Sequence, residues 1–463
     1  MEIPLTEDDI QRLMDMVDSG DAAAVLAECQ RDTTKDWVRL YVQGVALATL
    51  GRRQEALESV REAIHQNPSD RRPWWTAMHL MQGEASHADF IEFLPSYLER
   101  FPGDLQVRNF IGSVFSKEER WAEAQREFNQ AIAFDPRQSL AHFGKVVALI
   151  GEGRFEDASR ALEDGKAMRP RFDAQAAVRL NSEGLALAEL GRWSEAAAKF
   201  RAAVAAHIEA DEAHYNLGVA LKQMGAVDFF PFAPLNPMFR RLRDLFYAMS
   251  YYENQDPSWR SLNSMWQGRI MQKFPADMMT YHRILWETKP TLIVECGTFD
   301  GGSALYYASL FDMVGEGRVV SVDIIHKDGL PHHPRVEYIT GSSIAPEIVR
   351  RVRNAVRPGD RVMVVLDSNH DRDHVEAELA AYHDLVTSGC YLVVEDSSID
   401  LCPVANTHYQ NGGPLYAIAD FIGQHPEYVI DRRREQYLTT VAPYGFLYRI
   451  PPIPDRGTAS AES

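Results

Sequence analysis

Cysteine is scarce in this chain of 463 residues, which contains only four. They are Cys29, Cys296, Cys390 and Cys402, and no CxxC pair or Cys/His spacing of the zinc-binding kind accompanies them. Thiols so few and so dispersed argue against a disulfide framework or a zinc ribbon. Free cysteines in a reducing compartment are expected instead.

Long apolar runs and positive charge are also lacking. No stretch approaches the roughly 20 apolar residues that a membrane-spanning helix needs, and residues 1–9 are acidic, unlike a secretory signal. A soluble, cytoplasmic protein is therefore expected. The formal net charge of −18 repels the phosphates of nucleic acids, and the short basic runs at 350–353 and 432–434 are interpreted as solvated faces or strand ends. Nucleic acid is not an expected partner.

The first half of the chain carries an internal repeat. Pro68, Pro102, Pro136 and Pro170 stand 34 residues apart, and small residues such as Gly44, Gly112 and Gly184 recur in a related pattern. This period is similar to that of the tetratricopeptide repeat, in which pairs of antiparallel helices stack into an α-solenoid. Small residues let the two helices approach closely, and each proline ends the second helix. The resemblance covers residues 1–225.

Two interpretations of these repeats stay open. The array is either a concave surface for a peptide, a partner protein or a polymeric substrate, or a scaffold that only stabilises or oligomerises the rest of the chain. Residues 226–260 follow it, and the prolines and aromatic residues at their start favour a packed junction over a floppy linker. We expect a catalytic domain at 261–452 and a disordered tail at 453–463.

Short β-branched runs alternate with helical stretches in the second half. Strands are expected at 291–296, 318–324, 335–340, 361–367, 390–396, 427–432 and 437–448, and helices near 302–313, 344–356, 372–387 and 414–424. The alternation predicts a Rossmann-like, doubly wound α/β domain around a parallel sheet. In such sheets ligands bind beyond the carboxyl ends of the strands.

The first two strands end in residues suited to a nucleoside cofactor. A glycine-rich turn, Gly297–Ser303, follows the first strand, and Asp323 ends the second, where an acid can accept both hydroxyls of a ribose. Ser303 is also expected to cap the helix that follows. The alternative is a plain turn beside an exposed acid, but the combination favours a cofactor.

Three carboxylates end the fourth and fifth strands. Asp367 follows one, and Glu395 and Asp396 end the other. If these strands are neighbours, about 4.8 Å apart, the acids crowd together, which is unfavourable without a cation between them. Oxygen ligands suit a hard ion such as Mg²⁺. Alternatively, Asp367 caps a helix and the other two acids are solvated.

His370 lies three residues beyond Asp367 and is expected at the edge of the same site. A bound metal lowers the pKa of a hydroxyl that it coordinates, and a nearby imidazole can take the proton. The competing interpretation is a histidine at a helix start that faces solvent.

The stretch from about Trp266 to Ile450 resembles the cephalosporin hydroxylase / rhamnosyl O-methyltransferase family. The matching pieces are residues 266–268, 273–277, 295–298, 301–304, 341–343, 366–370, 394–396 and 431–435. The resemblance implies a fold that binds S-adenosylmethionine (SAM). Glu295 and the loop residues Gly297, Thr298, Gly301, Gly302 and Ser303 would hold its methionine part, Asp323 its ribose, and Ser342 would lie near the adenine.

The same resemblance implies that Asp367, Glu395 and Asp396 are magnesium ligands and that His370 is the general base. Members usually lack the repeat array, which leaves the size and identity of the substrate open. We expect a SAM-dependent, Mg²⁺-assisted O-methyltransferase acting on a sugar or glycan hydroxyl. Two alternatives are a methyltransferase or hydroxylase-like enzyme for a small natural product, and a partner-binding scaffold with an inactive catalytic fold.

Residues 397–413 form a long loop directly after the metal acids, and loops of this length near a site often act as lids. Its alternative is a surface insertion. Within it, His408 and Tyr409 are candidate substrate contacts.

Overall fold

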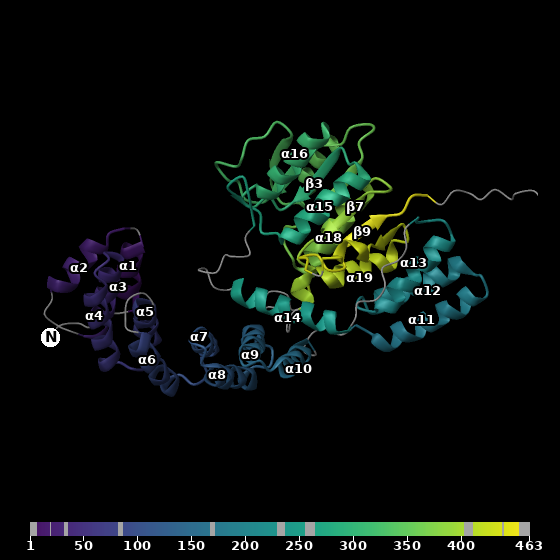
Figure 1. Ribbon diagram of the computed structural model, residues 1–463. Helices are drawn as coiled ribbons and strands as arrows, with labels where there is room; N and C mark the ends of the chain where they lie inside the picture. The colour runs from purple at the N-terminus through teal and green to yellow at the C-terminus, as the bar shows by residue number, and fades with distance from the viewer. Residues whose placement is uncertain are drawn as a thin grey trace, which may run out of the picture. The chain divides into compact units, whose positions relative to one another are not determined.

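The computed structural model describes residues 7–18, 20–31, 36–81, 87–166, 172–228, 237–254, 264–401, 411–437 and 439–452. The chain divides into two compact units, Met1–Phe134 and Asp135–Ser463. Helical repeats occupy the first unit and continue into the second, where they share one compact body with the α/β domain (Figure 1). No helix among the described residues is long and apolar enough to cross a membrane.

The first unit consists of helices. Their bounds are α1 Glu7–Asp18, α2 Ala22–Arg31, α3 Trp37–Thr49, α4 Arg53–Gln66, α5 Arg71–Met81, α6 His87–Arg100, α7 Leu105–Lys117 and α8 Trp121–Phe134. The 34-residue spacing translates directly into helix ends, because α4, α6 and α8 each stop two residues before Pro68, Pro102 and Pro136. Proline cannot supply the amide that another helical turn needs.

The same pattern fixes how the helices of a pair pack. Asp36 and Asp104 cap α3 and α7 by accepting from the amides of Arg39 and Val107 at 2.9 and 3.2 Å. A Cβ on Gly44 would lie 2.3 Å from Val60, and one on Gly112 would lie 2.6 Å from the ring of Phe128. Each glycine therefore makes room for a buried side chain of the partner helix.

The second unit begins with the later repeats. These are α9 Ser139–Gly151, α10 Phe155–Lys166, α11 Ala174–Glu189, α12 Trp193–Ala206 and α13 Asp211–Gln223. The 18-residue helix α14, Pro237–Asn254, follows within the expected junction and packs on α9. Proline is tolerated in the first turn of a helix, where its missing amide would have no partner.

A seven-stranded sheet forms the α/β part. Its strands are β3 Leu292–Cys296, β4 Arg318–Asp323, β5 Val336–Thr340, β6 Val362–Leu366, β7 Tyr391–Val394, β8 Tyr428–Ile430 and β9 Phe446–Arg449, in the order β5-β4-β3-β6-β7-β9-β8. All neighbours are parallel except β9, which runs antiparallel to β7 and β8. A small hairpin, β1 Met265–Trp266 and β2 Arg269–Ile270, lies before the sheet in the chain.

Helices cover both faces of this sheet, as the alternating pattern predicts. They are α15 Pro275–Thr288, α16 Gly302–Val314, α17 Pro346–Ala355, α18 Arg372–Tyr382 and α19 Pro414–Gln424. Ile293, Val365 and Val393 pack with α15 and α16 in one apolar core. Because alternate residues of a strand face opposite sides, Val294, Val364 and Leu392 point the other way, where they are also fully buried. The expected class, helical repeats followed by a Rossmann-like domain, is confirmed.

Candidate active site

Four parallel strands of the sheet end side by side. In the register, Cys296 of β3 pairs with Val322 of β4 and with Leu366 of β6, and Leu366 pairs with Val394 of β7. The backbone bonding continues past the strands, because the Asp367 amide donates to Cys296 at 2.8 Å and the Glu395 amide to Leu366 at 2.9 Å. The predicted cofactor loop and the predicted acids therefore start from one edge.

The glycines of the first loop let backbones approach each other. Gly297 has a φ of +102°, and a Cβ there would lie 1.8 Å from the carbonyl oxygen of Asp367. A Cβ on Gly302 would lie 2.3 Å from the carbonyl oxygen of Ile270, and one on Gly301 would lie 2.7 Å from Pro331. Gly297 thus lets the loop approach the segment that carries Asp367. Gly301 and Gly302 instead leave room for Pro331 and for the backbone of Ile270.

A chain of hydrogen bonds connects the buried residues around this loop. The Ser321 hydroxyl donates to Glu295 Oε2 at 2.6 Å and lies 2.7 Å from the Thr298 hydroxyl. Glu295 is fully buried, and burial raises its pKa to about 7. Its other oxygen, Oε1, has no hydrogen-bond partner among the described residues.

Ser303 does not cap the helix, contrary to the sequence-based expectation. Gly301 occupies the cap position of α16 and makes no side-chain cap bond, because the helix begins at Gly302. Ser303, inside the first turn, instead hydrogen-bonds Glu295 and lowers the pKa of that carboxyl.

Asp323 organises the loop from the neighbouring strand. Its Oδ2 accepts from the amides of Thr298 and Phe299 at 3.1 and 2.9 Å, and its Oδ1 accepts from Ile325 at 2.9 Å. A carboxylate has about four acceptor sites, so capacity for a further donor remains. Ser342 lies half-buried in the turn after β5, and its carbonyl accepts from Ala345.

The crowded acids already enclose one positive charge, which belongs to Lys273. Its fully buried ammonium lies 2.9 Å from Asp367 Oδ2 and 2.7 Å from Glu395 Oε2. Burial alone would lower the pKa of Lys273, but the two carboxylates raise it well above its ordinary value. The Tyr281 hydroxyl donates to the other oxygen of Glu395. Glu395 is thus held by two protein groups.

Asp396 pairs with His370 and makes no ion pair with that lysine within the described residues. Its backbone adopts the left-handed conformation, with a φ of +56°, which non-glycine residues adopt rarely. Its Oδ2 lies 3.0 Å from His370 Nε2. Donor atoms of Asp367, His370 and Asp396 all lie within 4.8 Å of one another, a spacing that suits a metal ion. His370 is partly exposed, with 22% of its side-chain surface accessible, and pairs with Asp396.

Sequence reasoning assigned no role to Lys273, Tyr281 or Asp277. Lys273 and Asp277 belong to residues 273–277, one of the segments on which the family resemblance rests. That match was the feature of the sequence that could have identified them. Asp277 is buried, burial raises its pKa to about 7, and its Oδ2 accepts from the amide of Val441 at 3.0 Å. These contacts join residues more than 90 positions apart, so no local pattern reveals them.

The loop after β7 is described only at its ends. Ser397–Leu401 form a short 3₁₀ helix, and Asp400 accepts from the amides of Gly413 and Leu415 at 2.9 and 2.8 Å. His408, Tyr409 and Cys402 lie outside the described residues. The lid therefore stays a prediction.

Comparison with known proteins identifies similar sequences for both halves. The profile of the family described as rhamnosyl O-methyltransferase/CmcI matches residues 259–450, and a tetratricopeptide-repeat profile matches 111–170 and 181–228. A rhamnosyl O-methyltransferase of Mycobacterium leprae (strain TN) is 38% identical over 192 residues, which cover 40% of this chain and 82% of the relative. One of Mycobacterium tuberculosis (strain ATCC 25618 / H37Rv) is 35% identical over 229 residues, covering 45% and 92%.

Solved structures resemble each half at low identity. A CmcI structure with Mg and SAM is 19% identical, with a TM-score of 0.33, and covers 42% of this chain and 81% of its own. MamA from Desulfovibrio magneticus RS-1 is 16% identical, with a TM-score of 0.29, covering 33% and 87%.

Proposed function

Because the chain belongs to the rhamnosyl O-methyltransferase/CmcI family, we propose that its α/β domain methylates a hydroxyl of a sugar or glycan, using SAM and a divalent cation. The observation that supports this most is the contact of the two predicted sites. Gly297 of the cofactor loop abuts Asp367, and Asp367 lies with His370 and Asp396 in the metal-compatible group.

The residues present fit a divalent cation. Asp367, Glu395 and Asp396 carry three formal negative charges and Lys273 carries one positive charge, which leaves two negative charges at a partly exposed edge of the sheet. Carboxylate oxygens suit Mg²⁺. Asp367 and Asp396 are its best-placed ligands, and Glu395 would have to share its oxygens with Lys273 and Tyr281. A bound cation would lower the pKa of the acceptor hydroxyl and bind two neighbouring oxygens, as on a sugar diol.

The residues also fit SAM. The unpartnered Oε1 of the buried Glu295 suits the ammonium of the methionine part, because a buried carboxylate oxygen without a partner is costly. Asp323 has acceptor capacity left for the ribose, and Ser342 lies in the turn that follows the adjoining strand β5. When bound, SAM supplies the methyl group.

His370 is the base in this proposal. Its Nε2 lies 3.0 Å from Asp396 Oδ2, so Nε2 carries the ring proton and Nδ1 is the nitrogen that takes the proton of the acceptor hydroxyl, while the Asp396 carboxylate stabilises the imidazolium that forms. Lys273 and Tyr281 fix the neighbouring Glu395, so the acid cluster is arranged before the acceptor binds. The protein mainly aligns and desolvates the reacting groups.

A glycan is the proposed acceptor class, and a small natural product is the alternative. The relatives are named for rhamnosyl methylation, and the repeats add a surface suited to an extended glycoconjugate or a partner protein. A small-molecule enzyme has no evident need for such an array.

The experiment gives the purified chain radiolabelled SAM and Mg²⁺ with rhamnose-containing glycans, and with small hydroxylated compounds in parallel. We expect label on the glycan, lost with a chelator and in Asp396→Asn. Label on small compounds alone would refute the acceptor class. SAM binding without any transfer would point to the inactive scaffold. Mass spectrometry of glycans from cells with and without the protein identifies the natural acceptor.

A further inference from the structure

A second cluster of side chains that could bind a metal lies apart from the acid group, which is the cluster of Asp367, His370, Glu395 and Asp396. His383 opens the 3₁₀ helix His383–Leu385 after α18, His425 follows the last residue of α19, and Glu427 directly precedes β8. Donor atoms of these three residues lie within 4.8 Å of one another. Glu427 Oε1 is 3.0 Å from His425 Nδ1 and 4.0 Å from His383 Nδ1.

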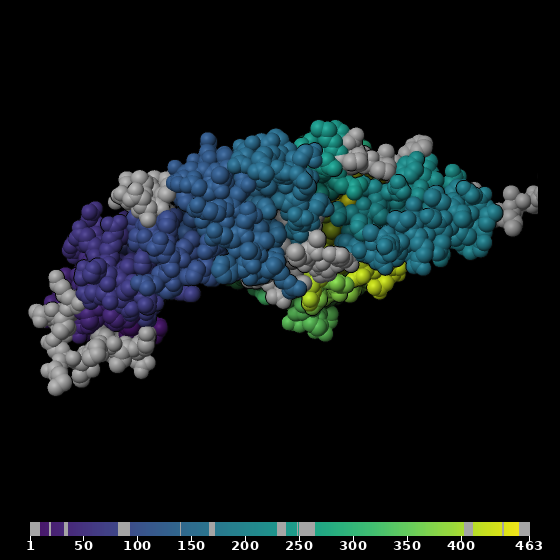
Figure 2. All heavy atoms as spheres, turned by 90° about the horizontal axis from the view of Figure 1, so that it is seen from below, coloured from purple at the N-terminus to yellow at the C-terminus, as the bar shows by residue number. Residues whose placement is uncertain are grey.

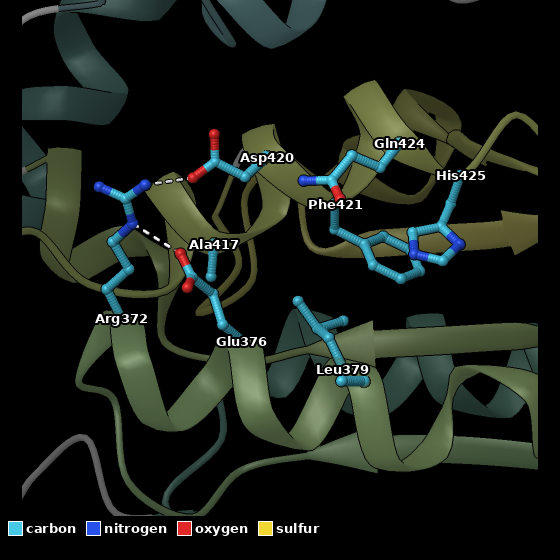
Figure 3. A pocket seen from close by; sticks show the side chains of 9 residues that line it. Arg372, Glu376, Leu379, Ala417, Asp420, Phe421, Gln424 and His425 are labelled. Carbon is cyan, nitrogen blue, oxygen red and sulfur yellow. Dashed lines mark hydrogen bonds and ion pairs between the residues drawn. The ribbon is translucent and has the colours of Figure 1, made fainter.

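The packing around the cluster orients its two rings. His425 stacks on Phe421, with ring centroids 4.1 Å apart and an interplanar angle of 20° (Figure 3). The centroids of His383 and His425 are 4.4 Å apart. His383 Nδ1 is buried and has no hydrogen-bond partner among the described residues. A buried ring nitrogen without a partner is costly, and a metal ion removes that cost.

The carboxylate of the cluster is available for a cation. Among the described residues, Glu427 has the two histidines and no lysine or arginine within 4.0 Å, and the charge of Arg201 acts on it only from farther away. The side chains of His383, His425 and Glu427 retain 23, 27 and 37% of their exposure, so an ion can reach them from solvent. His425 also lines a cavity of about 300 Å³ between α18 and α19 (Figure 3).

Two imidazoles and one carboxylate form a ligand set that binds Zn²⁺ more tightly than Mg²⁺. In a tetrahedral zinc site with bonds of about 2.0 Å, ligand atoms stand roughly 3.3 Å apart. The observed 3.0 and 4.0 Å bracket that spacing, so small side-chain rotations complete the geometry. Water can occupy the fourth position.

We propose that His383, His425 and Glu427 form a binding site for Zn²⁺ or a similar borderline divalent cation. The site is distinct from the acid group, which consists mainly of oxygen donors. It ties the end of α18 to the segment between α19 and β8. Arg201 of α12 holds that same segment, donating to the carbonyl oxygens of Pro426 and Tyr428 at 2.8 and 2.6 Å. Metal binding therefore stabilises the place where a repeat helix meets the α/β domain.

The test uses the full chain in excess Mg²⁺, which occupies oxygen-rich sites but competes poorly for imidazole. Zinc is titrated in competition with a chromophoric chelator, and Co²⁺ is added separately to record visible absorption. We expect one tight equivalent of zinc, a four-coordinate cobalt spectrum and a higher melting temperature with metal. His383→Gln and Glu427→Gln should each weaken zinc binding by about 10-fold or more.

His65→Gln, an exposed histidine of α4, is the matched control and should bind zinc like the wild type. SAM binding by calorimetry should be unchanged in His383→Gln, which shows that the variant is folded. If that variant does not fold, Glu427→Gln, whose side chain is the more exposed, decides the question. Zinc binding that is absent in the wild type, or equal in both variants and the wild type, overturns the proposal.

Discussion

At the scale of single residues, the candidate site depends on a buried lysine that makes one buried and two partly exposed acids compatible. Asp367, Glu395 and Asp396 all have raised pKa values, chiefly because they are buried, and Lys273 counteracts this at all three. Its ammonium has no solvent exposure. A buried charge without a partner costs far more than a surface charge, so this contact sets both the stability of the site and its charge.

Lys273→Met tests that role. The substitution keeps an unbranched apolar stem but leaves the buried Glu395 and the partly exposed Asp367 without their cation, and we expect the unfolding free energy at pH 7 to fall by about 3 kcal/mol. The loss should shrink as the pH falls, because protonation of the acids removes the repulsion. Denaturant unfolding at several pH values measures it. Lys199→Met, which removes the exposed partner of Glu183, should change stability little, and equal effects of both substitutions would contradict the assignment.

His370→Ala tests the proposed base. Loss of a general base typically slows the chemical step by about 10²–10⁴-fold, so turnover should fall by that factor while the SAM dissociation constant stays the same. Single-turnover transfer of labelled methyl groups and calorimetry measure the two quantities. The control is His374→Ala, four residues along the chain. The His374 ring lies 3.1 Å from the Ser368 hydroxyl and does not belong to the group formed by Asp367, His370 and Asp396. Unchanged turnover in His370→Ala refutes the role.

At the scale of elements, the repeats show how a sequence period becomes packing. Gly112 of α7 faces the Phe128 ring of α8, and Gly184 of α11 faces Phe200 of α12 in the same way, each pair 16 residues apart. The glycine gives up helix propensity, about 1 kcal/mol relative to alanine, so that an aromatic ring can fill the gap between helices.

Gly112→Ala should therefore destabilise the first unit despite the better helix propensity of alanine. Overpacking a filled core costs about 1–3 kcal/mol, and we expect a net loss of roughly 1 kcal/mol in thermal or denaturant unfolding. Adding Phe128→Leu should restore part of it, because leucine vacates the space that the new methyl needs. Gly103→Ala is the control, since a Cβ there meets no atom within 4 Å. A neutral Gly112→Ala would contradict the packing argument.

Most elements were predictable because their signals are local. The strand expected at 361–367 is β6, Val362–Leu366, and the neighbouring strands also begin and end within about two residues of the predicted positions, because β-branched runs bounded by glycines mark them. The expected strand 437–448 was wrong in extent, as β9 spans only Phe446–Arg449. Tyr444 has a φ of +62°, and a Cβ on Gly445 would lie 2.0 Å from the Val394 carbonyl oxygen, so a turn precedes the strand.

The position of the candidate site could be predicted from the sequence, but the pairing of its side chains could not. Parallel strands bring Asp367 and Glu395 together whatever lies around them, and the register of β6 and β7 confirms that these strands are neighbours. Which acid meets Lys273 and which meets His370 depends on contacts between distant segments and on the left-handed backbone of Asp396. No spacing in the sequence encodes those contacts.

At the scale of the whole second unit, the last repeats and the sheet share one core. Phe200 of α12, Leu217 of α13 and Val429 of β8 belong to a single apolar cluster, and α12 and α13 lie beside α19 and β9 (Figure 1). Seen from below, the teal surface of the last repeats adjoins the yellow surface of the C-terminal part of the chain (Figure 2). Buried Arg432 adds an ion pair to Asp211 of α13 at 2.8 Å.

His214 of α13 makes this junction sensitive to acid. It is buried beside Tyr444, its Nε2 lies 2.7 Å from the Ile208 carbonyl oxygen, and burial followed by the charge of Arg432 lowers its pKa to about 3. In the unfolded chain its pKa is about 6.5. Between these two pKa values the unfolded state binds a proton that the folded state does not. The contribution of His214 to the unfolding free energy is therefore complete above pH 6.5 and is lost as the pH falls toward 3.

The expected size follows from the same two pKa values. Each pH unit in that window removes about 1.4 kcal/mol, so His214 should lower the unfolding free energy by about 2 kcal/mol between pH 7 and pH 5. His214→Gln keeps a donor for the Ile208 carbonyl but does not titrate. The quantity to measure is the difference between wild type and variant across this range, because other groups cancel in it, and His65→Gln should leave the wild-type slope unchanged. Parallel pH profiles of the unfolding free energy for wild type and His214→Gln would contradict the prediction. They would show that water reaches His214 before the protein unfolds, because only a histidine that stays buried in the folded state has its pKa lowered in this way.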